Sequence, residues 1–331
     1  MSGSPSYWLL VRGRGGRRLD PEIRPDELRA HASTRRPSIR AGDRAVLYAA
    51  GWQVVFGVAD VVTDPAEDPE RARWRWRFGI RAELALHDLR EAPPVQAAGV
   101  LTSSLGRHSY IRLAQEQFAA GRRAVAAAIV AASYDDAVDR FVAGQGEFPA
   151  GARRRWIERL LAGLPPRPAI LELGVGAGHE TSVELAARGA LTGVDVSAAM
   201  LARARSRLPR ARLLQADVLE LELPEASFDA VVALYVLNHV LRDELGPLFH
   251  RIARWLRPGG RVLASLGARD TPTWSGEWLG APTIFSGYPP EENERLLLDA
   301  GLELVESSVE TTAEPGHGEV PFHWVLARRP D

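Results

Sequence analysis

Three glycines stand at alternate positions directly after an apolar run, in the stretch ILELGVGAGHE at residues 170–180. They are Gly174, Gly176 and Gly178, and Glu172 precedes the first of them by two positions. Glycine lets a ligand approach the backbone closely and adopts conformations that other residues avoid. In open α/β sheets, the turn after the first strand is a common nucleotide-binding position. The spacing therefore predicts a nucleotide-type site at the end of a strand.

Two further carboxylates follow apolar runs downstream of the glycines. Asp195 ends the run LTGVDV, roughly 20 residues on, where a carboxylate can accept hydrogen bonds from both ribose hydroxyls. Asp217 follows the third run, LLQA, and could accept one from an exocyclic amine. His179 stands where a dinucleotide fingerprint would have its third glycine. Glu172 would repel a pyrophosphate, so the pattern favours a nucleoside that carries a cationic group.

Alternating strand and helix patterns position these residues from residue 169 onward. The strand-like runs are AILELG, LTGVDV, ARLLQAD, FDAVVALYV and RVLASLG. The helical patterns are ETSVELAARG, SAAMLARARSRL and LGPLFHRIARWL. The alternation predicts a doubly wound α/β sheet, and LELVESSVE and VPFHWVLARR predict an antiparallel pair at its edge. Upstream, YDDAVDRFVA and ARRRWIERLLAGL predict two amphipathic helices.

Residues 7–118 have a different pattern, with short β-branched runs separated by turn residues. AVLYAA (45–50) and QVVFGVADVV (53–62) predict strands joined by a glycine-containing turn. RWRWRFGI (73–80) alternates with period two, as a strand does. GRHSYIRLAQEQF (106–118) predicts a strand that runs into a short helix. We therefore expect a β-rich module in this part of the chain.

A row of arginines accompanies the period-two segment. In a strand, one face would carry Arg71, Arg73, Arg75 and Arg77. Such a row suits phosphates, although a solvated outer face over an aromatic core explains it equally well. After this module, the Ala-rich segment 119–133 predicts a connecting helix.

The composition limits the chemistry. The 331 residues favour two domains, the cysteine count is 0, and every basic residue is arginine, with no lysine. Thiolate nucleophiles, cysteine-bound metals and catalytic lysines are excluded, and we expect no metal site. Residues 1–120 hold 18 Arg against 14 Asp and Glu, and residues 121–331 hold 23 against 28. This modest asymmetry permits a polyanion partner for the first part without requiring one.

The chain also shows no sign of a membrane segment. No apolar run approaches the roughly 18–20 residues that a membrane span needs. The N-terminal stretch MSGSPSYWLLVRGRGG lacks the basic start and long apolar segment of a signal peptide. We therefore expect a cytoplasmic protein without a membrane partner.

Residues 133–331 resemble the class I S-adenosylmethionine-dependent methyltransferases. The stretches LELGVGAG, GVDVS, LLQADV, FDAVVALYVLNHV and WLRPGGRVLASLG match the family's successive motifs in order and spacing. The resemblance implies a Rossmann-like sheet of seven strands. It also implies S-adenosyl-L-methionine as cofactor and S-adenosyl-L-homocysteine as product.

The same resemblance implies a set of cofactor-binding residues. Gly174 and Gly176 would bracket the methionine part, Asp195 would hold the ribose, and Asp217 the adenine. The full set is Tyr134, Glu172, Gly174, Gly176, Asp195, Val196, Met200, Ala216, Asp217, Val218 and Leu234. Phe141 stands where the family usually has a second tyrosine, so a polar contact is not expected there.

The acceptor can be narrowed by elimination. The stretch ALYVLNHV lacks the Asn/Asp-Pro-Pro-aromatic loop of amino-methyltransferases of DNA and some RNA. C5-pyrimidine methylation needs a cysteine, and 2′-O-methyltransferases rely on lysine; the chain has neither. O-, N- or C-methylation of a small molecule remains, or a nucleic-acid reaction without those signatures. LYVLNHV followed by LFHRIARWLRPGG resembles the ubiquinone/menaquinone-type small-molecule methyltransferases.

Residues 268–294 are expected to form an irregular stretch above the cofactor, either a substrate lid with an aromatic wall or a hydrophobic cap that completes the fold. The candidate substrate-binding residues are Tyr235, Trp274, Trp278 and Tyr288. Phe285 is expected in the same aromatic wall. His239, just past the fourth strand, is the best placed candidate for a catalytic base, or else a packing residue. His323 is a second catalytic candidate, since its strand could face the same cavity.

The stretches SYWLLV, IRAGDRAVLYAAG, VVFGVADVV and SYIRLAQEQF resemble the EVE/PUA-like family of small β-barrels. The resemblance covers residues 6–118 and implies a pocket with aromatic walls that binds a modified base in DNA or RNA. We place Trp8, Trp52 and Ser109 near such a pocket, with Tyr110, although Trp8 and Tyr110 could equally belong to the core.

These patterns predict an EVE/PUA-like domain over residues 1–118, a connecting helix over 119–132 and a methyltransferase domain over 133–331. The leading hypothesis is a methyltransferase for a small-molecule acceptor. One alternative is a methyltransferase for a modified nucleic acid or nucleoside. Another is a non-catalytic reader that binds the cofactor only as part of its scaffold. The oligomeric state stays open.

Overall fold

The computed structural model describes residues 4–13, 18–24, 28–105, 108–144, 150–314 and 318–331. The chain divides into two compact units, Met1–Ile129 and Val130–Asp331. The division falls inside one helix, α1, which spans Gln115–Gly144.

The first unit is built around one curled sheet. Its strands follow the order β2-β6-β4-β3-β1-β7, with β5 paired to β6. They are β1 (Tyr7–Arg12), β2 (Ala30–Ser33), β3 (Arg44–Ala49), β4 (Val54–Val61), β5 (Ala66–Glu67), β6 (Trp76–Ala85) and β7 (Tyr110–Leu113). β1 and β3 are parallel, and the other pairs are antiparallel. Two 3₁₀ helices, Val95–Ala98 and Thr102–Leu105, precede β7.

The two ends of this strand order approach each other. His31 Nε2 in β2 lies 3.2 Å from the carbonyl oxygen of Ser109, which directly precedes β7. Arg12 in β1 donates to the carbonyl of Ala30 in β2 at 2.6 Å. Since β2 and β7 are the outer strands of the order, these contacts require the sheet to curl strongly.

The row of arginines is not on one strand face, and that prediction is wrong. β6 begins only at Trp76, because Trp74 has a positive φ of 60°, which breaks the extended backbone. Carboxylates accompany the arginines, which are paired as Arg71–Asp68 (3.1 Å), Arg75–Glu67 (3.2 Å) and Arg77–Asp68 (3.6 Å). The segment is therefore less positive than its arginines alone suggest.

The helix α1 is longer than expected. The sequence predicts a connecting helix that ends near residue 133 and a separate helix after it, whereas the structure has one continuous helix of 30 residues. No proline interrupts residues 119–144, and the Ala-rich run favours helix throughout. In the first unit, Arg122 of this helix donates to Glu83 at 2.8 Å.

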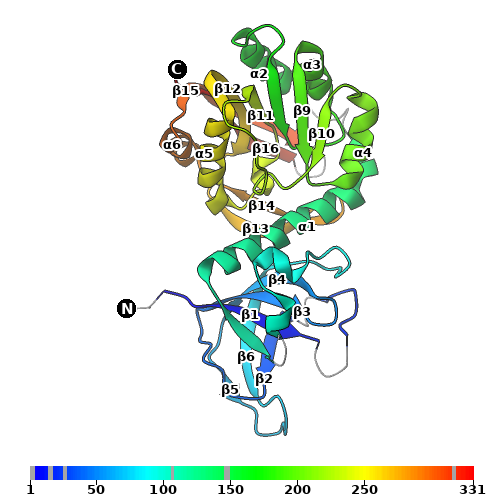
Figure 1. Ribbon diagram of the computed structural model, residues 1–331, viewed down its shortest axis with the longest axis vertical. Coiled ribbons are helices and arrows are strands. Elements are labelled where there is room, and N and C mark those ends of the chain that lie inside the picture. The colour runs from blue at the N-terminus through cyan, green and yellow to red at the C-terminus, as the bar shows by residue number, and fades with distance from the viewer. Residues whose placement is uncertain (1–3, 14–17, 25–27, 106–107, 145–149, 315–317) are drawn as a thin grey trace. The chain divides into compact units, whose positions relative to one another are not determined.

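The second unit (Figure 1) contains a seven-stranded sheet in the order β10-β9-β8-β11-β12-β16-β15. Its strands are β8 (Ala169–Leu173), β9 (Ala190–Asp195), β10 (Arg212–Gln215), β11 (Phe228–Ala233), β12 (Leu256–Gly267), β15 (Glu303–Glu314) and β16 (Gly318–Arg328). β16 runs antiparallel to both neighbours, and the other pairs are parallel. The doubly wound sheet, its seven strands and the antiparallel edge pair are confirmed.

Helices cover both faces of this sheet. One apolar core takes Trp156, Leu185 and Leu201 from α2 (Ala150–Ala162), α3 (Glu180–Arg188) and α4 (Ala198–Arg207). The other takes Phe249 and Leu297 from α5 (Leu245–Trp255) and α6 (Pro290–Asp299). Neighbouring strand residues alternate between the two cores, as the pleat requires.

Residues 268–294 are more regular than expected, and that prediction is wrong. They contain an antiparallel hairpin of β13 (Thr271–Trp278) and β14 (Ala281–Gly287), followed by the start of α6. Leu279 and Gly280 form its turn with φ values of 50° and 76°. Two positive φ values suit a tight hairpin turn, but leucine rarely occupies such a position. The turn therefore had no clear signal in the sequence.

In the described parts of the chain, no helix combines the length and the apolar character that crossing a membrane requires.

Candidate functional site

The glycine loop connects β8 to α3 at the carboxyl edge of the sheet. Gly174 has a φ of 70°, and a Cβ there would lie 2.7 Å from the Cβ of Val236. Gly176 has a φ of 54°, but a Cβ there would meet only Phe141, at 3.9 Å. Close packing against Val236 thus requires glycine at residue 174. At residue 176 the positive φ favours glycine, and the space beside it is open.

Asp195 joins the glycine loop to the start of α4. Its Oδ2 accepts from the backbone nitrogen of Gly176 at 2.8 Å, and its Oδ1 accepts from that of Ser197 at 2.9 Å. Burial raises the pKa of Asp195 to about 6, although these backbone donors act in the opposite direction. The carboxylate is held rigidly at the end of β9, where each oxygen keeps a second lone pair for a hydroxyl donor.

Glu172 is buried, with 6 % of its surface exposed. The Ser182 hydroxyl donates to its Oε1 at 2.8 Å, whereas its Oε2 has no hydrogen-bond partner among the residues that the structure describes. Burial raises the pKa of this carboxyl to about 7. An unpartnered buried oxygen is costly, so the position suits a ligand that brings a hydrogen-bond donor or a positive charge.

The residues after β10 approach the same edge. The backbone nitrogen of Ala216 donates to the carbonyl of Asp195 at 3.0 Å, and Asp217 accepts from the nitrogen of Leu219 at 2.9 Å. Val218 is buried, and its carbonyl accepts from Arg251 at 2.8 Å. These contacts place Asp217 and Val218 beside Asp195.

The remaining predicted cofactor residues lie at the ends of the adjacent elements. Met200 is fully buried in the first turn of α4, and its nitrogen donates to the Ser197 hydroxyl at 3.0 Å. Val196 and Leu234 are half-buried, directly after β9 and β11. The carboxyl ends of four neighbouring strands thus bring the predicted residues of the sheet together.

The second half of α1 reaches this region, and sequence reasoning missed one of its residues. Asp135 accepts from the Ser197 hydroxyl and from the nitrogen of Ala199, at the start of α4. Asp139 of the same helix pairs with Arg203 of α4. Asp135 stands within an amphipathic pattern, which offered no sign of its partner. The helix α1 is therefore fastened to α4 beside Asp195.

His239 is held between two hydrogen bonds. Its Nδ1 lies 2.8 Å from the carbonyl oxygen of Ile284 in β14, and its Nε2 lies 2.9 Å from the Tyr134 hydroxyl in α1. A carbonyl only accepts, so Nδ1 carries the proton and Nε2 accepts from Tyr134. Burial lowers the pKa of His239 to about 4. The side chain is a neutral imidazole at physiological pH.

Aromatic rings surround this histidine. We call Tyr134, Phe141, His239, Trp274, Trp278 and Phe285 the aromatic cluster. Trp278 has its ring 5.3 Å from that of Tyr134 and 5.9 Å from that of Phe141. Phe285 lies 5.2 Å from His239 and 5.3 Å from Trp274. Trp278 is buried, whereas Trp274 is 49 % exposed, so the cluster runs from the interior to the surface.

Tyr235 and Tyr288 lie in other surroundings. Tyr235 packs at 4.7 Å against Phe322 and carries Arg153 over its ring at 4.3 Å. Tyr288 packs against the core under α5 and α6, with Arg242 over its ring at 5.1 Å. The described ring contacts do not join either tyrosine to the aromatic cluster.

His323 and His179 are also separate from His239. His323 is 1 % exposed on β16, 3.4 Å from both Glu294 Oε1 and Asn293 Nδ2 of α6. Burial lowers its pKa, and its described polar partners are those of a packing residue. His179 caps α3, since its Nδ1 accepts from the nitrogen of Thr181 at 3.3 Å.

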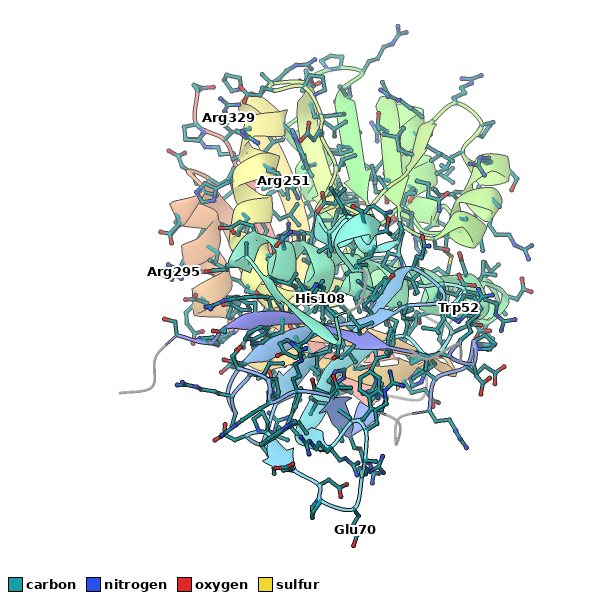
Figure 2. All side chains as sticks on the ribbon, turned by 60° about the horizontal axis from the view of Figure 1, so that its bottom comes forward. Trp52, Glu70, His108, Arg251, Arg295 and Arg329 are labelled. Carbon is teal, nitrogen blue, oxygen red and sulfur yellow. The ribbon has the colours of Figure 1, made fainter. Side chains whose placement is uncertain are left out.

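The aromatic residues predicted for the first unit have different partners. Trp8 is buried and donates from its indole nitrogen to the buried Asp43 at 2.8 Å, while its ring packs edge-on against Tyr110. Trp52, labelled in Figure 2, belongs to the turn between β3 and β4, and Arg18 covers its ring at 3.7 Å. The partners of Trp8 are those of a core residue.

Comparison with known proteins finds matches over part of the chain. Residues 170–260 match the family model described as methyltransferase domain. A probable S-adenosylmethionine-dependent methyltransferase of Mycobacterium tuberculosis is 33% identical over 132 residues, which are 40% of this chain and 47% of that protein. A phosphatidylethanolamine N-methyltransferase of Cereibacter sphaeroides is 38% identical over 100 residues, 28% of this chain and 48% of that protein. The chain thus spans about half the length of these curated relatives.

A solved structure shows the same fold. The 1,6-didemethyltoxoflavin-N1-methyltransferase of Burkholderia thailandensis is 24% identical, with a TM-score of 0.50 over 66% of this chain and 92% of that one. It supports the fold predicted for the second unit. Residues 170–260 therefore match a methyltransferase domain, and this solved structure supports the Rossmann-like fold of the second unit.

Proposed function

We propose that the second unit is an S-adenosylmethionine-dependent methyltransferase that acts on a small-molecule acceptor. The observation that carries the proposal is Asp195, whose two oxygens join the glycine loop to the start of α4 at the carboxyl edge of the sheet. Ligands of open α/β sheets bind at that edge. The family match over residues 170–260 supports the same assignment.

The described residues fit the cofactor. The unpartnered Oε2 of Glu172 suits the cationic amino-acid end, and the open space beside Gly176 lets a ligand approach the backbone. Asp195 would accept from the ribose hydroxyls, and Asp217 with Val218 would face the adenine. When bound, S-adenosylmethionine supplies an electrophilic methyl group, which forms a bond to the acceptor as the C–S bond breaks and its electron pair stays on sulfur.

The aromatic cluster would exclude water and orient the acceptor. Positioning and desolvation provide much of the rate of such a displacement. With a pKa of about 4, His239 is mostly neutral at pH 7, but its Nε2 already accepts from Tyr134. We therefore propose an acceptor that arrives with an available lone pair, whose proton leaves to solvent after transfer.

A planar small molecule fits the half-exposed ring of Trp274 at the outer end of the cluster. The names of similar proteins support a small acceptor or a lipid. They include the phosphatidylethanolamine N-methyltransferase, a demethylmenaquinone methyltransferase of Tropheryma whipplei, 32% identical over 108 residues, and the didemethyltoxoflavin enzyme. We therefore propose a small-molecule acceptor rather than a polyanion.

Turnover with named acceptors would test the proposal. The full chain is incubated with tritiated S-adenosylmethionine and one acceptor at a time. The acceptors are phosphatidylethanolamine vesicles, a demethylmenaquinol and 1,6-didemethyltoxoflavin. Transfer of label to the amine of phosphatidylethanolamine or to a ring nitrogen of 1,6-didemethyltoxoflavin supports the proposal. Transfer to the ring carbon of the demethylmenaquinol, which carries no lone pair, would keep a small-molecule acceptor but contradict the available lone pair. Tight binding of S-adenosylhomocysteine, with label transferred only to a nucleic acid that carries modified bases, would instead favour the alternative acceptor. Failure of the chain to bind S-adenosylhomocysteine would reject the methyltransferase assignment.

For the first unit, we propose the EVE/PUA-like character that its sequence suggests, with a modified base as ligand. The approach of β2 to β7 through His31 and Ser109 supports a curled, barrel-like sheet. The acid pairing of Arg71, Arg75 and Arg77 favours recognition of a base over a long phosphate track. Fluorescence anisotropy tests this proposal by measuring the affinity of the full chain, and of its Trp52→Ala variant, for an oligonucleotide that contains 5-methylcytosine. Equal affinity for the unmodified oligonucleotide would contradict it.

A further inference from the structure

One imidazole joins three segments of the second unit that are distant in sequence. His239 lies in the 3₁₀ helix Leu237–His239 after β11, Tyr134 in α1 and Ile284 in β14. The residue pairs are separated by 105 and 45 positions. His239 thus makes one hydrogen bond to α1 and one to β14.

The direction of the two hydrogen bonds leaves His239 little freedom. Ile284 offers only a carbonyl oxygen, so Nδ1 must carry the proton. Nε2 is then an acceptor, and the Tyr134 hydroxyl donates to it, with the Asn238 amide nitrogen as a longer second donor at 3.4 Å. A base that accepts a substrate proton at Nε2 would first have to lose the hydrogen bond of Tyr134.

The groups that face His239 are uncharged. They are the Tyr134 phenol from α1, the Asn238 amide from its own turn, the Ile284 carbonyl, and the Phe285 and Trp278 rings from the hairpin. Burial is the main cause of its lowered pKa, which the Ile284 carbonyl opposes. These surroundings stabilise the neutral imidazole and leave a protonated one without a counter-ion.

Phe141 links this arrangement to the glycine loop. Its ring lies 6.0 Å from that of Tyr134, and its Cε1 lies 3.9 Å from the position of a Cβ on Gly176. Both aromatic residues belong to one helix, so Tyr134 and the loop border the same region. The Tyr134 hydroxyl donates a hydrogen bond to His239, so its oxygen can act only as an acceptor toward a ligand in that region.

We propose that His239 is a positioning residue, which as a neutral imidazole aims the Tyr134 oxygen at the positively charged sulfonium end of the cofactor. This inference rests on the proposed function. It replaces the predicted role of His239 as a base and gives Tyr134 a preference for a cation over the neutral thioether of the product.

Binding of two cofactor analogues to the full chain tests the proposal. Sinefungin carries an ammonium group near the sulfonium position, whereas S-adenosylhomocysteine is neutral there. We expect Tyr134→Phe and His239→Leu to weaken sinefungin binding about tenfold, and S-adenosylhomocysteine binding less than about threefold. His239→Gln keeps one donor and one acceptor, so it should stay within about threefold of the wild type for both ligands. Titration calorimetry gives all the dissociation constants.

The double variant Tyr134→Phe/His239→Leu sharpens the test. If His239 acts through Tyr134, the double variant binds sinefungin no more weakly than either single variant. Additive losses, or equal losses for both ligands, would overturn the proposal. His250→Gln, at an exposed histidine on α5, is the matched control.

A spectroscopic measurement does not depend on the variants folding. The ¹⁵N shifts of His239 in the wild type should show a proton on Nδ1 and no titration between pH 5.5 and 8. A proton on Nε2, or a titration near the ordinary histidine pKa, would overturn the proposal. If the wild type binds neither analogue, the proposed function fails, and the shifts still decide the state of His239.

Discussion

The glycine loop and the aromatic cluster both border the carboxyl end of the sheet, but their electrostatics are opposite. Around the loop, burial raises the pKa of Glu172 to about 7 and that of Asp195 to about 6. In the cluster, burial lowers the pKa of His239 to about 4. The loop keeps acids where a polar and cationic ligand would bind, and the cluster keeps its imidazole neutral where we propose that the methyl group is transferred.

The two regions also differ in how the chain builds them. Glu172, the glycines and Asp195 lie within 24 consecutive residues, on two adjacent strands and the loop between them. The cluster takes its rings from α1, from the turn after β11 and from the hairpin. A locally encoded site depends on a few hydrogen bonds, whereas a composite site depends on packing among distant segments. Variants in the two regions should therefore change different properties.

The largest expected effect is on the stability of the cluster. Trp278→Ala removes a buried ring that contacts Tyr134, Phe141 and His239, and we expect a loss of about 3–5 kcal/mol in the free energy of unfolding. Trp274→Ala, on the same strand but half exposed, should cost less than about 1 kcal/mol. Urea denaturation measures both. Equal losses would show that the hairpin does not pack as one side of a core.

The next effect is on cofactor binding at the loop. Asp195→Ala should weaken S-adenosylhomocysteine binding about 100-fold, because it removes the acceptor for the ribose and frees the Gly176 and Ser197 nitrogens. Asp299→Ala, at an exposed aspartate paired with Arg295 on α6, is the control. Titration calorimetry gives the ratio of the dissociation constants of variant and wild type. Undiminished binding to the alanine variant would place the cofactor elsewhere.

Glu172→Gln should separate stability from binding. Burial holds the folded-state pKa above its ordinary value of 4.5, so the ionised carboxyl costs stability as the pH rises from about 4.5 through 7. At pH 7.5 we expect the free energy of unfolding of the variant to be about 2 kcal/mol higher than that of the wild type. We also expect the variant to bind S-adenosylhomocysteine more weakly. The difference in stability should vanish near pH 4.5.

The control for that variant is Glu180→Gln, at an exposed position in the first turn of α3. It should change the free energy of unfolding by less than about 0.5 kcal/mol at either pH. A stabilised control, or an unchanged Glu172→Gln, would mean that burial of the Glu172 charge is not costly.

The smallest effect is the acid sensitivity of the cluster. The folded-state pKa of His239 lies below its ordinary value of 6.5, so the stability that it contributes is present above pH 6.5 and is lost as the pH falls toward 4. When the pH falls from 7 to 5.5, the free energy of unfolding of His239→Gln should decrease by about 1 kcal/mol less than that of the wild type. Thermal unfolding at the two pH values, with His250→Gln as control, measures the difference. Identical slopes would contradict the neutral buried imidazole.

The glycine loop was predictable because its determinants are local. Glycines with positive φ, a carboxylate before them and a second one at the end of the next strand form a pattern within one strand–turn–helix–strand unit. The parallel pairing within the sheet follows from the alternation of strands and helices, since parallel strands need crossovers. The residue roles at this edge stay predictions, although the structure brings Asp195, Asp217 and Gly176 together.

The hairpin and the continuous α1 helix were less predictable. The turn of the hairpin uses Leu279 at a positive φ, which its sequence does not indicate. Asp135 could not be linked to Ser197 from the sequence, because the two residues are 62 positions apart. Tyr235 and Tyr288 have the residue type expected of an acceptor wall, but their orientation depends on Phe322 and on the core under α5 and α6.

The sequence by itself determined the α/β sheet of the second unit, the β-rich character of the first and the acids at the strand ends. Periodicity and residue type are local properties, and they suffice for these features. Only the tertiary structure decided that His239 lies between Tyr134 and Ile284, because a tautomer depends on which atoms face each ring nitrogen. Packing of three distant segments thus sets the hydrogen-bond partners of both ring nitrogens of His239.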